Sequence, residues 1–88
     1  MYESDVEKKI CKLARDNGWI TYKFSACNEK GVPDRIFIKE GRIIWTEIKR
    51  ADGIVSRMQE YQLARMNNMG CEVFVWRSVE EAKEVLCD

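Results

Sequence analysis

The sequence predicts an α/β fold in which a mixed β-sheet is flanked by helices, with the element order α-β-β-β-α-β-α. Residues 32–38 and 43–49 are predicted to form two strands that fold back on each other around a tight turn, which is typical of a β-hairpin. Amphipathic helical patterns precede and follow this segment. The second of these helices separates the hairpin from the last strand, so that strand can run parallel to its neighbour.

Length and composition limit the chain to one small domain. Its 88 residues leave no room for a second core, so we expect a single domain over residues 1–88. No apolar run approaches the roughly 20 residues of a membrane helix, and no signal-peptide pattern is present. We therefore expect an intracellular, cytoplasmic protein without membrane contact. Dimerisation would add stability to so small a core.

The formal net charge is zero, but the charges are unevenly distributed. Residues 17–58 carry eight basic and five acidic side chains, whereas residues 59–88 carry three basic and six acidic ones. A basic surface around an acidic pocket suits a phosphodiester substrate, although a solvated charged surface explains so small an excess equally well. The chain has no histidine, which excludes histidine general bases and Ser-His or Cys-His pairs.

The four cysteines have no metal-binding spacing. No C-x-x-C pair occurs, so a zinc site is not expected. We expect all four to be reduced and buried as small hydrophobic side chains, namely Cys11, Cys27, Cys71 and Cys87.

The first helix is expected over residues 5–16. Ser4 and Glu7 have the spacing of a capping box, and an apolar stripe follows that ends before Gly18. Glu7 lies at the edge of this stripe, so its carboxylate can either cap Ser4 or reach inward. A strand is expected over Trp19–Ser25, with Lys23 on its polar side, where an exposed lysine needs no function.

The hairpin is expected to pair residues 32–38 with residues 43–49 around the turn Lys39–Arg42. In this register the numbers of paired residues add to 81, so Asp34 faces Glu47. Because side chains alternate along a strand, Lys49 shares the face of Glu47. The same face carries apolar side chains, namely Val32, Ile36, Ile38, Ile43 and Trp45.

Two carboxylates opposite each other in a sheet are unfavourable unless another charge compensates. Lys49 can do so in a partly solvated ion cluster at the end of the sheet. A divalent cation is the alternative, because hard oxygen ligands suit magnesium, manganese or calcium.

Two further helices and a strand complete the predicted fold. Ser56 is a good cap for a helix that runs to about Asn68, and Gln59 lies in its first turn. Its apolar residues are expected to join the core. Cys71–Arg77 is apolar on both faces, as in a covered strand, and Ser78 opens a last helix with a second capping box.

Gly31-Val32-Pro33-Asp34, followed by Glu47-Ile48-Lys49, resembles the signature of the PD-(D/E)XK nuclease superfamily, and more narrowly the VRR-NUC domain of short phage and bacterial proteins. The resemblance covers about residues 3–76. It implies the restriction-endonuclease-like core and metal-dependent hydrolysis of DNA phosphodiesters. It also implies a homodimer that cuts branched, cruciform or Holliday-junction-like DNA in repair.

The resemblance assigns roles to particular residues. The implied Mg²⁺ or Mn²⁺ ligands are Asp34, Glu47, the main-chain carbonyl of Ile48, and Glu7, with Glu3 as the rival of Glu7. Lys49 would orient the attacking water and stabilise developing charge, and Gln59 would complete the catalytic set. The candidate nucleic-acid contacts are Lys23, Lys30, Arg35, Arg50, Ser56 and Arg57.

Two functions without catalysis remain open at this point. The chain can be a nucleic-acid-binding module that retained the fold without the activity, or a structural subunit of a replication or repair assembly. The presence of all four expected catalytic residue types in order favours the enzyme, whereas the zero net charge favours a subunit.

Overall fold

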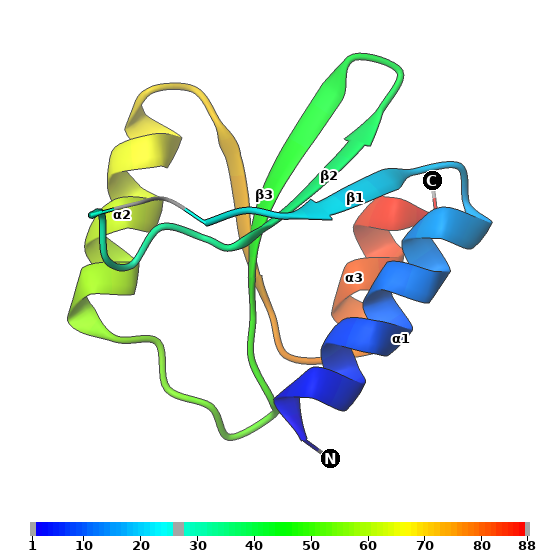
Figure 1. The fold of residues 1–88 in the computed structure, drawn as a ribbon, viewed down its shortest axis with the longest axis horizontal. Coiled ribbons are helices and arrows are strands. Elements are labelled where there is room, and N and C mark those ends of the chain that lie inside the picture. The colour runs from blue at the N-terminus through cyan, green and yellow to red at the C-terminus, as the bar shows by residue number, and fades with distance from the viewer. Residues whose placement is uncertain (1, 26–27, 88) are drawn as a thin grey trace.

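The computed structural model describes residues 2–25 and 28–87. The elements are α1 (Glu3–Asp16), β1 (Ile20–Lys23), β2 (Arg35–Lys39), β3 (Arg42–Ile48), α2 (Arg57–Asn68), β4 (Glu72–Trp76) and α3 (Val79–Leu86). The strands form one sheet in the order β1-β2-β3-β4, in which only β3 and β4 are parallel. Helices α1 and α3 lie side by side on one side of the sheet, and α2 lies on the other (Figure 1). The predicted α/β fold and element order are therefore confirmed.

The hairpin formed by β2 and β3 has the predicted register. Ile36 pairs with Trp45, and Ile38 pairs with Ile43. Glu40 and Gly41 both have positive φ, 50° and 83°, as a two-residue type I′ turn requires. Strand β2 begins at Arg35, later than predicted.

The core lies on the sheet face that packs against α1 and α3. Phe37 and Ile44 are register partners on this face, and both are fully buried. The apolar stripe of α1 and the inner side of α3 complete the core, with Val6, Ile10, Ala14, Ala82 and Leu86. The opposite face, which carries the predicted apolar row, is far more open: Ile20, Tyr22 and Ile43 are about half exposed (52%, 56% and 48%). Within residues 2–25 and 28–87, no helix is long and apolar enough to cross a bilayer.

The predicted cap of the first helix is wrong. Helix α1 starts at Glu3 with Tyr2 as its N-cap residue, and no side chain caps it. The N–H groups of Asp5 and Val6 donate to the Tyr2 carbonyl, so the first turn has already closed where Ser4 was expected to cap it. Glu7 is therefore free to reach toward the sheet.

The other two helices begin at the predicted caps. The Ser56 hydroxyl accepts from the Gln59 N–H (3.1 Å), and the Gln59 side chain accepts from the Ser56 N–H (2.9 Å). Ser78 likewise caps α3. The prediction that α2 supplies core residues is wrong, because within α2 only Gln62 is buried, and Met58 and Tyr61 are about half exposed.

The cysteines differ in their environments. Cys11 is buried and free, and burial raises the pKa of its thiol above the ordinary value. Cys71 is half-buried and Cys87 is exposed, so the expectation of burial is wrong for these two. Cys27 lies outside the described residues.

Gly31 allows α2 to pack closely against the segment that leads into β2. Its φ is +85°, and a β-carbon there would lie 2.5 Å from the carbonyl carbon and oxygen of Met58. We expect Gly31→Ala to lower the free energy of unfolding by roughly 2–4 kcal/mol in chemical denaturation, since backbone strain and overpacking both contribute. Gly70→Ala is the matched control, because Gly70 has φ +93° with open space around it. Equal losses in both variants would show that the close approach to Met58 contributes nothing.

Candidate active site

The hairpin brings Asp34 and Glu47 together at one end of the sheet. The paired residues end at Arg35 and Thr46, and continuing the register by one residue sets Asp34 opposite Glu47. The main chain holds Asp34 there, because its carbonyl accepts from the Phe24 N–H (2.6 Å). The Glu47 side chain is only 9% exposed, whereas that of Asp34 is 47% exposed. The pair therefore consists of one buried and one accessible carboxylate.

The electrostatics of Glu47 follow from this placement. Burial and, to a smaller extent, the nearby Asp34 carboxylate together raise the pKa of Glu47 to about 7, although Lys49 acts in the opposite direction. The Lys49 ammonium lies 3.9 Å from Glu47 Oε2, and the Lys49 side chain is largely buried. One lysine does not compensate the burial of this carboxylate beside a second one. A bound divalent cation would compensate it, and the two carboxylates are the hard oxygen donors that such a cation prefers.

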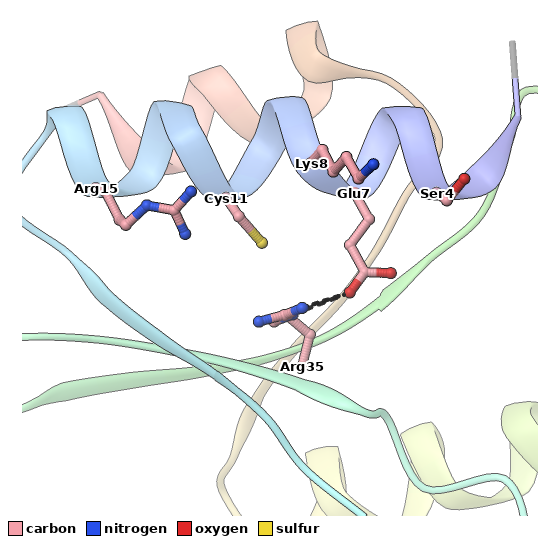
Figure 2. A pocket seen from close by; sticks show the side chains of 6 residues that line it. All are labelled: Ser4, Glu7, Lys8, Cys11, Arg15 and Arg35. Atoms are coloured by element: carbon pink, nitrogen blue, oxygen red, sulfur yellow. Dashed lines mark hydrogen bonds and ion pairs between the residues drawn. The ribbon is translucent and has the colours of Figure 1, made fainter.

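Glu7 reaches the same end of the sheet from α1 but is bound to another residue. Its Oε2 accepts from Nη2 (2.6 Å) and Nε (3.2 Å) of Arg35, which projects from the core-facing side of β2 (Figure 2). Glu3 and Glu7 both raise the pKa of Glu47, Glu3 by more. Within residues 2–25 and 28–87, no group of three or more Asp, Glu, Cys or His side chains is arranged to hold a metal ion. A third acidic ligand is thus not in place, and both helix acids are near enough to be candidates.

The expected nucleic-acid contacts lie in three parts of the structure. Lys23 lies beside the acidic site, with its Nζ 3.9 Å from Glu7 and 4.0 Å from Asp34, and Arg35 holds Glu7. Arg50 pairs with Asp52, a neighbour in its own loop (2.9 Å). The remaining candidates, Lys30, Ser56 and Arg57, are exposed around the N-terminus of α2.

Gln59 and Ile48 differ in the groups that they can offer to a ligand. The carboxamide oxygen of Gln59 is used in the capping box, so only its NH₂ group is available for another partner. Ile48 is a buried core residue at the end of β3, directly between Glu47 and Lys49. Its side chain fixes the end of the strand, and only its main chain can contact a ligand.

The sequence prediction missed two basic residues of α1. Lys8 and Arg15 line a pocket of about 350 Å³ together with Ser4, Glu7, Cys11 and Arg35 (Figure 2). The signal was available in the spacing, because residues 4, 7, 8, 11 and 15 share one face of a helix. Their proximity to Arg35 could not be read without the tertiary structure.

Comparison with known proteins supports the fold and the family. No family model matches the chain. Over 74 residues it is 34% identical to "Putative nuclease p44" of Acyrthosiphon pisum secondary endosymbiont phage 1, across 83% of this chain and 80% of that protein. A solved structure described as "VRR_NUC domain" is similar with a TM-score of 0.85 at 24% identity, covering 94% of this chain and 91% of the other. The resemblance inferred from Asp34, Glu47 and Lys49 is confirmed.

Proposed function

Because this chain belongs to the VRR-NUC family of the PD-(D/E)XK nucleases, we propose that it is an endonuclease that hydrolyses DNA phosphodiesters with Mg²⁺ or Mn²⁺. The observation that carries the proposal is the buried Glu47 carboxylate beside Asp34 and Lys49. A carboxylate buried beside a second carboxylate, with one lysine as compensation, destabilises the fold and is therefore expected to serve a function.

Asp34 and Glu47 would hold the metal ion, with the main-chain carbonyl of Ile48 as a further ligand. When bound, the ion supplies Lewis-acid chemistry that polarises the phosphate and makes water a better nucleophile. Glu7 would hold the metal ion directly, through water, or at a second metal site if it released Arg35. Glu3 is the alternative, because no ion pair holds it within the described part of the chain.

Lys49 would act through its charge. Its side chain is largely buried on the face of Glu47, where the low local dielectric strengthens the attraction of the ammonium for a phosphate that gains negative charge. It would also orient the attacking water by a hydrogen bond. Gln59 would contact water or phosphate through its NH₂ group while its oxygen keeps α2 capped.

The DNA would approach along the basic side chains around the acidic site. Lys23 stands at the edge of this site, and the remaining contacts come from loops, from the start of β2 and from the N-terminus of α2, namely Lys30, Arg35, Arg50, Ser56 and Arg57. We infer that the chain is a single domain acting in the cytoplasm, where DNA is accessible to a phage or bacterial enzyme.

We further propose a homodimer that acts on branched or cruciform DNA in replication or repair. A single site cannot make paired cuts across a junction, so two copies would be required. The open sheet face supports association, because Ile20, Tyr22 and Ile43 expose apolar surface there. Burying this face would also add to the stability of a small core.

Cleavage of a cruciform plasmid tests the proposal. We expect the protein to linearise the plasmid with Mg²⁺ or Mn²⁺, to be inactive in EDTA, and to lose activity in the Asp34→Ala variant. Asp16→Ala is the matched control, because Asp16 is an exposed aspartate whose contact is Lys12 on the same helix (2.7 Å). Binding of the plasmid without cleavage in either metal would contradict the nuclease and would instead support a nucleic-acid-binding module.

A further inference from the structure

The pocket between α1 and the start of β2 is a second polar site outside the Asp34–Glu47 pair. It has a volume of about 350 Å³ and is lined by Ser4, Glu7, Lys8, Cys11, Arg15 and Arg35. Figure 2 shows the side chains of Arg15 and Cys11 projecting from α1 toward the strand that carries Arg35. A pocket of this size accommodates a phosphate group with part of an attached sugar.

The charge of the pocket is positive. Lys8, Arg15 and Arg35 supply three positive charges, and Glu7 supplies one negative charge, which Arg35 already neutralises. Within residues 2–25 and 28–87, the side chains of Lys8 and Arg15 have no hydrogen bond or ion pair. Two cations thus face the pocket without a counterion from the described chain.

Arg35 is held in a position that leaves donors available. Two of the five N–H groups of its guanidinium, on Nε and Nη2, donate to Glu7 Oε2. The Arg35 side chain is only 16% exposed, so the carboxylate fixes the orientation of the planar group. The three remaining N–H groups can donate to a ligand, and guanidinium groups match phosphate oxygens in geometry.

The pocket adjoins the proposed active site through Glu7. The same Glu7 oxygen that accepts from Arg35 lies 3.9 Å from Lys23 Nζ, and that ammonium lies 4.0 Å from Asp34 Oδ2. A nucleic-acid strand with one phosphate at Asp34 and Glu47 therefore has a nearby basic site for another phosphate along the strand.

We propose that this pocket binds a second, non-scissile phosphate of the DNA strand, with Arg15, Arg35 and Lys8 as its cationic contacts. This inference rests on the proposed function, because it takes the bound strand to be DNA. The ligand is a phosphate group of the strand, either an internal phosphodiester or a terminal 5′-phosphate. The site positions the strand relative to Asp34 and takes no part in bond breaking.

The salt dependence of DNA binding tests the pocket, measured in EDTA so that no cleavage occurs. The probe is a fluorescent duplex with a single-stranded 5′ overhang that ends in either a phosphate or a hydroxyl. Each phosphate contact releases counterions, so the logarithm of the DNA-binding constant falls linearly with the logarithm of the salt concentration. We expect Arg15→Gln to make this slope shallower by about 0.7–0.9 and to weaken binding roughly five- to tenfold at 0.1 M salt. Lys8→Gln should act in the same direction.

Arg65→Gln is the matched control, because Arg65 is an exposed arginine in the last turn of α2, as Arg15 is in α1. A preference of the unaltered protein for the 5′-phosphate that Arg15→Gln removes would identify a terminal phosphate as the ligand. A reduced salt slope without such a preference would identify an internal phosphodiester. Salt slopes for Arg15→Gln and Lys8→Gln that equal the slope of the control would overturn the pocket proposal, even if the protein cleaves DNA. A protein that binds DNA through the pocket but never cleaves it would contradict only the nuclease.

Discussion

Lys49→Ala is expected to reduce the rate of DNA cleavage by about 10²–10³-fold while leaving the fold and metal binding intact. Removing one group that stabilises transition-state charge in a buried site typically has an effect of this size. The Lys49 side chain is 15% exposed and its ammonium lies 3.9 Å from Glu47 Oε2, so water does not readily replace its charge. The measurement is the single-turnover cleavage rate of a cruciform plasmid at saturating protein.

Two comparisons separate the role of Lys49 from that of a metal ligand. Asp34→Ala should remove both cleavage and the stabilisation of the protein by Mg²⁺ or Mn²⁺ in thermal unfolding. Lys49→Ala should remove cleavage and retain that stabilisation, because an ammonium does not ligate a cation. Lys83→Ala, at an exposed lysine of α3, is the control. A Lys49→Ala variant that cleaves within a few-fold of the unaltered rate would rule out the proposed electrostatic role.

The hairpin was the part of the fold most accessible to sequence reasoning. Alternation with a period of two and a two-residue turn with glycine together leave few possible registers, and the predicted pairing of Ile36 with Trp45 is correct. The same reasoning predicted that Asp34 lies beside Glu47, although the two are thirteen residues apart in the chain. Both inferences depend on local geometry that the sequence specifies directly.

Features that depend on packing were less accessible. Both faces of the hairpin carry large apolar residues, and only the structure shows that Phe37 and Ile44 face the core while Ile43 is half exposed. The pairing of Glu7 with Arg35 joins a helix to a strand 28 residues away, and no local pattern indicates it. For the same reason, the sequence could not show that Lys8 and Arg15 share a pocket with Arg35.

Glu47→Gln is expected to stabilise the metal-free protein at pH 8 while abolishing cleavage. The pKa of Glu47 is raised from 4.5, its ordinary value, to about 7 in the folded protein. Between pH 4.5 and pH 7 the folded state therefore retains a proton on Glu47 that the unfolded state has lost. Stability therefore falls as the pH rises from about 4.5 to about 7, by roughly 3 kcal/mol for this group. Glutamine resembles the protonated acid in shape and charge, so the variant should lack this loss.

The free energy of unfolding, measured in urea and EDTA from pH 4.5 to 8, tests this expectation. The variant and the unaltered protein should have similar stabilities near pH 4.5 and diverge toward pH 8, where the variant should be more stable. Glu84→Gln, at an exposed glutamate of α3, is the control and should not diverge. Equal stabilities of Glu47→Gln and the unaltered protein at pH 8 would mean that the buried carboxylate does not destabilise the fold.

Metal addition links this destabilisation to the proposed function. A ligand that binds only the folded state adds RT ln(1 + [L]/Kd), which is about 1.4 kcal/mol when Mg²⁺ is tenfold above its Kd. The unaltered protein should gain this stabilisation at pH 8 and gain less at pH 6, because a proton on Glu47 competes with the metal. Glu47→Gln should gain little at either pH. If Mg²⁺ and Mn²⁺ stabilised both proteins equally, Glu47 would not be a ligand, and its burial would need a different explanation from metal-dependent cleavage.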